Sequence, residues 1–145
     1  MEVLIRDITH ADKAGVIDMM RKFYASDAVH TNGSDEIFSN DVDACLSDSP
    51  FLSGYCFTVD GQLAGYAMTA HSFSTEFGKP CVWIEDIYIK EEYRRHGIGK
   101  RFFEMIEERH SDSILRLEAE EENTSAVALY RSRGFEVMPY LELKK

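Results

Sequence analysis

A basic turn that contains two glycines is the clearest candidate in the chain for binding a phosphorylated ligand. An apolar stretch is followed by the run Arg94-Arg95-His96-Gly97-Ile98-Gly99-Lys100, and residues with helical spacing come next. Glycine has no Cβ, so a ligand can approach the main chain closely at Gly97 and Gly99. The first N–H groups of a helix lack internal acceptors and carry the positive end of the helix dipole. Together with the cationic side chains, these groups favour binding of a pyrophosphate.

The turn differs from two common phosphate-binding loops. A Walker loop has four residues between its glycines and then Gly-Lys-Ser/Thr, and the chain contains no such run. The dinucleotide-binding pattern G-x-G-x-x-G would need glycine at the position of Phe102. A lone Gly-x-Gly pair is equally compatible with an ordinary helix start whose arginines are solvated, so a second signal has to decide.

A second segment, further along the chain, provides that signal. Asn123 is followed seven residues later by Tyr130, and then by Arg133-Gly134-Phe135. With the basic turn, this segment resembles the GNAT superfamily of acyl-CoA-dependent N-acetyltransferases over nearly the whole chain. The matching residues are Arg94, Gly97 and Gly99 for the central signature, and Asn123, Ala126, Leu129-Tyr130 and Gly134-Phe135 for the later one.

The resemblance implies a binding mode for acetyl-CoA, with no metal. The cosubstrate is expected to lie between two parallel strands that splay apart, one ending at Ile89 and the other at Ala119. The main chain of the first strand would pair with the pantetheine amides, and an N–H group near Ile87 would polarise the thioester carbonyl. The N–H groups of 95–100 would hold the pyrophosphate, and Asn123 would reach the pantetheine arm. The expected acetyl-CoA-binding residues are Ile87, Tyr88, Ile89, Arg94, Arg95, His96, Gly97, Ile98, Gly99, Lys100, Asn123 and Ala126.

The resemblance also assigns Tyr130 as the acid that protonates the departing thiolate. A phenol with a pKa of about 10 is protonated at neutral pH and suits this role. The alternative is a tyrosine of the apolar core, because Ala126, Leu129 and Tyr130 can share one face of an amphipathic helix.

Glu85 is the candidate base, by resemblance, and acts through water on an ammonium that is charged at neutral pH. In a regular strand, Glu85 shares a face with Ile87 and Ile89, whereas Asp86 shares the other face with Tyr88. Carboxylates within an apolar strand are costly to bury unless they are paired or functional. The alternative is that either acid bonds a neighbouring loop or lies at a solvated bulge, and the sequence leaves open which of the two faces the acceptor.

A narrower resemblance concerns the acceptor. The runs 77–80 and 83–89 are similar to a segment of diamine acetyltransferases of the spermidine/spermine type, although Ile87 stands where an aromatic residue is usual. This implies a primary amine as acceptor, with a polyamine as the finer expectation, bound by Asp27, Glu85 and Asp86. Asp27 is equally compatible with a surface or cap acid. The rival hypotheses are acetylation of a protein or peptide, and a non-catalytic CoA-binding sensor.

The elements that would position these residues alternate along the chain. Thr9 and Asp12 resemble a capping box that opens a helix reaching about Ala25. The polar, acidic region 26–53 predicts a mobile substrate loop or a solvated connection, with a weak helix around 41–46. The resulting prediction is one α/β (α+β) domain over residues 1–145, a mixed and mostly antiparallel sheet with splayed parallel strands flanked by helices. The expected strands are 3–6, 55–59, 63–72, 81–89, 114–119, 135–137 and 140–143, with a hairpin turn at Asp60-Gly61 between the second and the third. The later helices are 97–110 and 124–133, and Gly134 is the expected stop of the last one.

Composition narrows the class of partner. The chain has 145 residues, with 16 basic and 26 acidic side chains and a formal net charge of −10. This excess repels phosphate backbones and anionic lipids, so we expect neither nucleic acid nor membrane as a partner. Three dispersed cysteines indicate neither a disulfide framework nor a zinc site, and the absence of a secretory signal or a spanning apolar stretch predicts a cytoplasmic location. The family resemblance adds a homodimer as an expectation.

Overall fold

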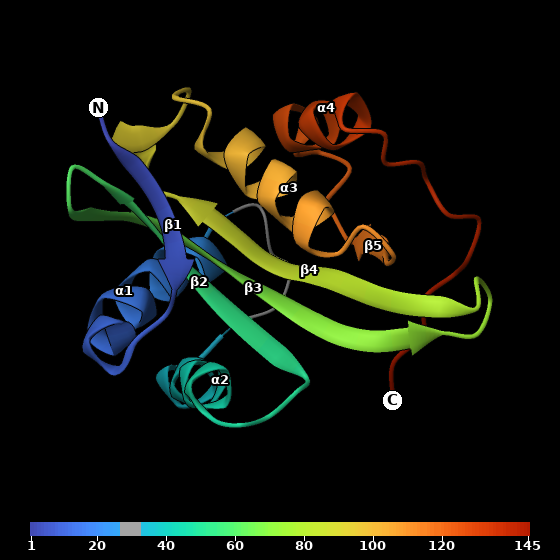
Figure 1. Cartoon of the computed structure of the whole chain (residues 1–145), viewed down its shortest axis with the longest axis horizontal. Helices are drawn as coiled ribbons and strands as arrows, with labels where there is room; N and C mark the ends of the chain where they lie inside the picture. The colour runs from blue at the N-terminus through green and yellow to red at the C-terminus, as the bar shows by residue number, and fades with distance from the viewer. Residues whose placement is uncertain (27–32) are drawn as a thin grey trace.

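Five strands form one sheet in the order β1-β2-β3-β4-β5 in the computed structural model, which describes residues 1–26 and 33–145 (Figure 1). The strands are β1 (Val3–Asp7), β2 (Leu52–Val59), β3 (Gln62–Ser74), β4 (Lys79–Ile89) and β5 (Ile114–Leu117). The helices are η1 (His10–Asp12), α1 (Lys13–Tyr24), α2 (Asp35–Leu46), η2 (Glu91–Tyr93), α3 (Ile98–Arg109) and α4 (Thr124–Ser132). No helix of the described residues is long and apolar enough to span a bilayer.

The sheet is antiparallel except at its last pair, where β4 and β5 run parallel. The parallel pairing covers only four residues of each strand, from Cys81–Ile84 on β4 and from Ile114–Leu117 on β5. β4 continues for five more residues after β5 has ended. The predicted mixed sheet with one parallel pair flanked by helices is therefore confirmed.

Helices cover both faces of the sheet (Figure 1), and consecutive side chains of the inner strands β2 and β3 are therefore buried. Successive side chains of a strand point to opposite faces, and β2 shows the consequence. Phe57 packs in the cluster with Phe102 of α3, whereas Cys56 packs in the cluster with Met20 of α1 and Val42 of α2. α3 thus lies on one face, and α1 and α2 lie on the other.

The β2–β3 hairpin confirms the turn expected at Asp60-Gly61. Both turn residues have positive φ, 48° and 80°, which is the conformation that suits the twist of a two-residue hairpin. The predicted helix stop at Gly134 is confirmed as well, since its φ is 92°.

The region 26–53 is more helical than its composition suggested. α2 spans twelve residues rather than a weak helix around 41–46, and Ser34 caps it by accepting a hydrogen bond from the Ile37 N–H at 3.2 Å. Phe38 and Val42, one turn apart, are buried against α1 and the sheet. The helix expected around 41–46 is therefore confirmed, whereas the prediction of a loop or solvated connection was wrong for residues 35–40, because two buried side chains are enough to dock this acidic helix.

The two strands predicted at the C-terminus are absent from the described structure. Residues 135–145 contain no strand, and Val137, Leu141 and Leu143 are 78%, 85% and 83% exposed. Pro139 stands between the two predicted segments and has no N–H to donate to a neighbouring strand. Apolar alternation alone predicted strands here, but it does not form them without a paired sheet edge.

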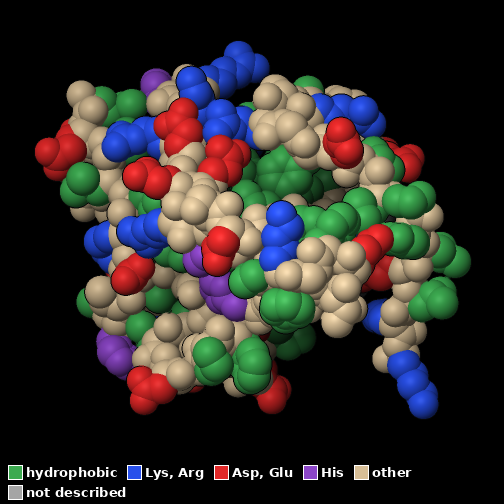
Figure 2. Space-filling model, turned by 45° about the vertical axis from the view of Figure 1, so that its right-hand side comes forward, with side chains coloured by type: hydrophobic (Ala, Val, Ile, Leu, Met, Phe, Trp, Pro, Cys, Tyr) green, Lys and Arg blue, Asp and Glu red, His purple; other side chains and the backbone are tan. Residues whose placement is uncertain are grey.

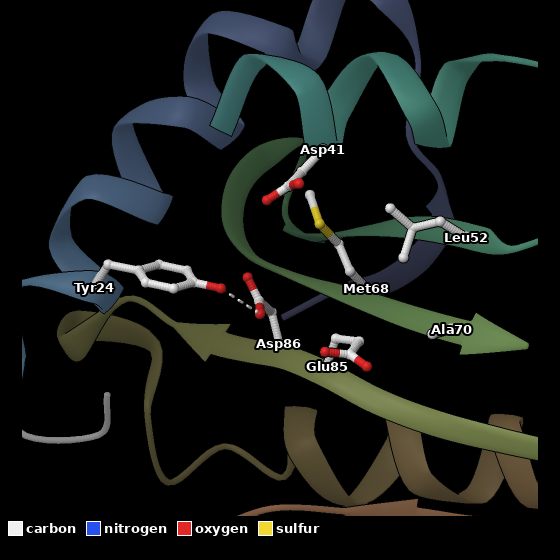
Figure 3. Close-up of a pocket in the computed structure, with 7 residues that line it drawn as sticks. All are labelled: Tyr24, Asp41, Leu52, Met68, Ala70, Glu85 and Asp86. Atoms are coloured by element: carbon white, nitrogen blue, oxygen red, sulfur yellow. Dashed lines mark hydrogen bonds between the residues drawn. The ribbon is translucent and has the colours of Figure 1, made fainter. Parts of the chain in front are cut away.

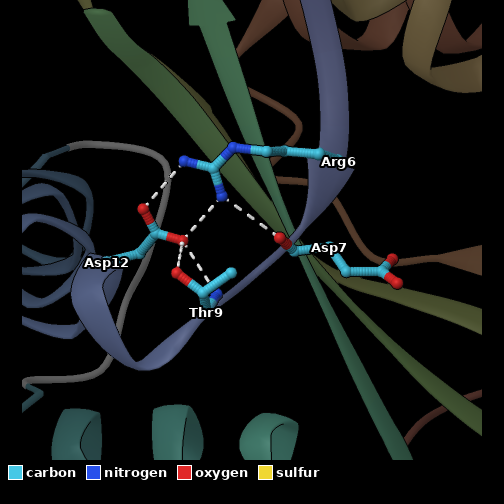
Figure 4. Close-up of polar contacts among 4 residues, drawn as sticks. All are labelled: Arg6, Asp7, Thr9 and Asp12. Carbon is cyan, nitrogen blue, oxygen red and sulfur yellow. Dashed lines mark hydrogen bonds and ion pairs between the residues drawn. The ribbon is translucent and has the colours of Figure 1, made fainter.

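A polar network fixes the entry to α1, as Figure 4 shows. The Arg6 guanidinium donates to both oxygens of Asp12, at 2.7 and 2.9 Å, and the Thr9 N–H donates to the same carboxylate at 2.8 Å. The predicted contact between Thr9 and Asp12 is confirmed. Hydrogen bonds from Arg6 hold the pKa of Asp12 well below its ordinary value.

Replacing Asp12 with Asn should lower the free energy of unfolding at pH 7 by about 1 kcal/mol, the usual value of a helix-start cap. Because folding lowers the pKa of Asp12, its contribution is present above the unfolded pKa of about 4 and is lost as the pH falls through the folded value. Denaturant titration should therefore show a larger deficit at pH 7 than at pH 3. Asp18→Asn, which removes an exposed acid of α1, is the control; a deficit independent of pH would contradict the account.

Candidate active site

The edge of β4 beyond its pairing with β5 is the backbone feature around which the site is built. Ile84 is the last residue of β4 paired with β5, whereas Ile87, Tyr88 and Ile89 pair only with β3. No strand of the described residues pairs with the other edge of residues 85–89. That edge could accept a ligand's amide groups in the way it would accept an additional strand.

The basic turn lies at the end of this strand. The Arg94 side chain donates to the Ile89 carbonyl at 2.8 Å, and its guanidinium carbon lies 5.8 Å from the centre of the Tyr88 ring. Arg95, His96 and Lys100 are exposed. In Figure 2, Lys and Arg side chains gather along the upper edge of the molecule, where Figure 1 places the turn between η2 and α3.

The start of α3 presents main-chain N–H groups in this turn. The first main-chain hydrogen bond of the helix runs from the Arg101 N–H to the Gly97 carbonyl at 3.1 Å, so the N–H groups of Ile98, Gly99 and Lys100 precede the helical ladder. Arg95 and Gly97 have φ of 66° and 76°, and such left-handed residues fold the N–H groups of a turn into a concave anion site. These residues fit the pyrophosphate cradle expected from the sequence.

Gly99 lies in the gap between β4 and α4. A Cβ at this position would lie 3.7 Å from Ile89 Cδ1 and 3.8 Å from Leu129 Cδ2. The end of β4, the start of α3 and the middle of α4 therefore converge on one residue that has no side chain.

α4 contributes the predicted residues from the later signature. Asn123 precedes the helix, and its main chain bonds Glu120 and Val127, while its partly exposed side chain makes no cap hydrogen bond. Ala126 is partly buried on the same helix.

Tyr130 packs its ring between two aromatic residues and leaves its hydroxyl without a hydrogen bond to any described residue. The ring centre lies 5.8 Å from that of Phe103 and 6.2 Å from that of Phe135. Burial raises the pKa of the Tyr130 phenol, so the group is protonated at neutral pH. The ring belongs to the core, as one hypothesis held, and the free hydroxyl is compatible with the other.

A β-bulge places the two acids of β4 in one cavity. Asp86 pairs with Met68 and Ile84 with Thr69, so Glu85 is an extra residue in β4. The regular strand assumed from the sequence would have put Glu85 and Asp86 on opposite faces. Instead, both line a cavity of about 160 Å³ on the face of α1 and α2, as Figure 3 shows.

Asp86 is held in place by two tyrosines that the sequence analysis did not single out. It is 5% exposed, and its two oxygens accept hydrogen bonds from Tyr24 at 3.0 Å and Tyr66 at 2.8 Å. Burial raises the pKa of Asp86, and the two hydrogen bonds oppose this shift. Burial, and then repulsion from Asp86 and Asp41, also raises the pKa of Glu85.

Further carboxylates surround the cavity and the end of β5. Asp41 of α2 lines the cavity. A hydrogen bond with Glu142 and partial burial raise the pKa of Glu118, just beyond β5, to about 7. The Tyr140 hydroxyl donates to Glu76 at 2.5 Å and thereby ties the C-terminal segment to the turn between β3 and β4. The predicted amine-binding residue Asp27 lies outside the described residues.

The comparisons with known proteins agree with this geometry. The profile of the Acetyltransferase (GNAT) family matches residues 17–135. A thialysine N-epsilon-acetyltransferase from Bos taurus is 28% identical over 145 residues, covering 91% of this chain and 83% of that protein. The crystal structure of a possible acetyltransferase from Clostridium difficile 630 superposes with a TM-score of 0.82 at 21% identity, covering 100% of this chain and 97% of that one. The structure of an aminoglycoside N-acetyltransferase in complex with CoA superposes with a TM-score of 0.80 at 16% identity, covering 99% of this chain and 94% of that one.

The chain belongs to the GNAT family of acetyltransferases. The predicted fold and the predicted class of enzyme, an N-acetyltransferase, are both confirmed. No group of three or more His, Cys, Asp or Glu side chains in residues 1–26 and 33–145 is arranged to hold a metal ion.

Proposed function

We propose that the protein transfers the acetyl group of acetyl-CoA directly to a primary amine of a small, cationic acceptor. The observation that carries this proposal is the acidic cavity beside the unpaired edge of β4, with the basic turn at the end of the same strand. The two regions have opposite charge, as an anionic cosubstrate and a cationic acceptor require. A polyamine or related diamine is the finer form of the proposal.

The basic turn and the strand edge supply positioning in this reaction. Acetyl-CoA provides the thioester whose acyl carbon the amine attacks. The N–H groups of residues 95–100 would hold the pyrophosphate, and the free edge at Ile87 would fix the pantetheine and polarise the thioester carbonyl. Asn123 and Ala126 would line the wall of the acetyl-CoA site that lies opposite β4. The aminoglycoside N-acetyltransferase solved with CoA has the same fold, which supports this assignment.

Two side chains would move protons. Glu85, whose pKa is raised by partial burial and by its acidic neighbours, would remove a proton from the ammonium through water. Tyr130, whose phenol stays protonated at neutral pH, would give a proton to the departing thiolate.

Release of free CoA in a screen of polyamines, amino acids, aminoglycosides and peptides tests the proposed function. We expect release with small polyamines. Release with peptides alone would favour acetylation of a protein, and saturable binding of acetyl-CoA without release for any amine would favour a CoA-binding sensor.

The expectations of a homodimer and a cytoplasmic location stay predictions. Val137, Leu141 and Leu143, which are mostly exposed, support the former.

Replacing Glu85 with Gln should lower the turnover number by about 10²-fold. It should also abolish the acid limb of the pH–rate profile, which is the fall of turnover at low pH. Only the ionised carboxylate can accept a proton, so wild-type turnover at saturating amine should fall as the pH drops through the pKa of Glu85. Because that pKa is raised, the fall should begin above the ordinary value for a glutamate. Glu108→Gln, which removes the same charge from the exposed face of α3, should keep the wild-type profile. An unchanged acid limb in Glu85→Gln would exclude Glu85 as the base.

A further inference from the structure

The cavity beside Glu85 contains a third carboxylate on a different element. Figure 3 shows Asp41 reaching from α2 toward β4, across the cavity from Glu85. Tyr24 and Asp86 lie at one side, and apolar atoms of Leu52, Met68 and Ala70 form the remaining wall. None of the described lining residues is basic. The cavity therefore combines an apolar wall with negative charge on two opposite sides.

The three carboxylates are not equivalent. Both oxygens of Asp86 already accept tyrosine hydroxyls, and this side chain is nearly inaccessible. Asp41 makes no hydrogen bond or ion pair with any residue of the described ranges. Partial burial and the charge of Asp86 raise the pKa of Asp41 to about 6, so its environment lacks a compensating positive charge. Asp41 and Glu85 are thus the two acids able to receive a ligand's cations.

We propose that Asp41 is a specificity-determining residue, which binds a second ammonium group of the acceptor while Glu85 faces the amine that is acetylated. This inference rests on the proposed function. The methylene chain between the two nitrogens would lie against Leu52, Met68 and Ala70. An amino acid is a poorer fit, because no basic side chain of the described lining can receive its carboxylate.

The size of the cavity limits the buried part of the acceptor. An apolar protein cavity of about 150 Å³ holds a molecule the size of benzene, with six non-hydrogen atoms. The cavity here measures about 160 Å³, which matches the six non-hydrogen atoms of a diamine with a four-carbon chain. A longer polyamine would fill it with one end.

The test compares two amines of equal chain length, 1,4-diaminobutane and butylamine, as acceptors for the wild type and for Asp41→Asn. The wild type should prefer the diamine by at least about tenfold in kcat/KM, as expected for one additional partly buried ion pair. Asp41→Asn should raise the KM for the diamine at least about tenfold and change kcat/KM for butylamine less than about threefold. Asp41→Glu should restore part of the preference. Asp43→Asn, an exposed acid two residues away on α2, should behave as the wild type.

The outcomes separate this inference from the proposed function. An equal loss for both amines in Asp41→Asn, with an unchanged unfolding temperature, would overturn the role of Asp41 but keep the transfer reaction. A wild-type protein that acetylates other amines but shows no preference for the diamine would likewise overturn the role of Asp41 and keep the transfer reaction. A wild type that acetylates no amine would overturn the proposed function, and the inference with it.

Discussion

Replacing Tyr130 with Phe is expected to lower the turnover number of acetyl transfer at least tenfold and to change the KM for acetyl-CoA less than about twofold. The lost group is the proton donor for the thiolate, and general acids commonly contribute about 10²–10⁴-fold. The phenol is available for this purpose because burial raises its pKa and because its hydroxyl has no partner among the described residues.

The same geometry makes the Tyr130→Phe variant easy to interpret. Its phenyl ring would keep the edge-to-face contacts with Phe103 and Phe135, so the free energy of unfolding should stay within about 0.5 kcal/mol of the wild type. Tyr140→Phe is a matched control, since it removes a hydroxyl that donates to Glu76 outside the proposed site. Initial rates of CoA release and denaturant titrations measure both quantities. Full turnover in Tyr130→Phe would leave Tyr130 with a role in packing alone.

The sequence was sufficient to predict the basic half of the site, because its conformation depends on residues that are close together in the chain. The positive φ of Gly97, the start of α3 and the stop at Gly134 follow from residue types within a few positions of each other. The same holds for the hairpin at Asp60-Gly61. Glycine tolerates left-handed conformations, and this preference is local, so the chain near each of these positions determines its own conformation.

The acidic half of the site depends on long-range packing and was only partly predictable. The bulge at Glu85 arises from the pairing of β4 with β3, which no local pattern around Glu85 encodes. Tyr24 is the last residue of α1, and its hydrogen bond to Asp86 spans 62 residues, so no neighbouring residue predicts it. Asp41 carried one weak signal, since it lies three residues after buried Phe38 and next to buried Val42, at the border of the helix's apolar face.

The predicted C-terminal strands show the opposite error. The segment 135–143 has the alternation of a strand, but a strand is stabilised by a neighbour that pairs with it. β5 has only four paired residues, and beyond Phe135 the side chains of Val137, Leu141 and Leu143 stay mostly exposed. The sequence pattern therefore predicted which residues could form a strand. It did not predict whether a sheet edge is available to pair with that strand.

Replacing Gly99 with Val is expected to raise the KM for acetyl-CoA about thirtyfold, the equivalent of one lost charge-assisted hydrogen bond of about 2 kcal/mol. Its Cβ would make ordinary contacts with Ile89 and Leu129, so the unliganded fold should tolerate the side chain. The γ-methyl groups would then fill the gap between β4 and α4 that the pantetheine is proposed to enter. Turnover at saturating acetyl-CoA should change less than KM, because no proton-transfer group is removed.

A pair of alanine variants separates binding by the turn from stability of the turn. Gly97 and Gly61 have φ of 76° and 80°, and a Cβ at either position would meet nothing within 4 Å. Alanine should therefore lower the free energy of unfolding by about 1 kcal/mol at both sites, through backbone strain alone. Only Gly97→Ala should also weaken acetyl-CoA binding, measured by isothermal titration calorimetry, because only Gly97 orients N–H groups toward the proposed pyrophosphate. Equal affinity in the two variants would show that this turn does not hold the cosubstrate.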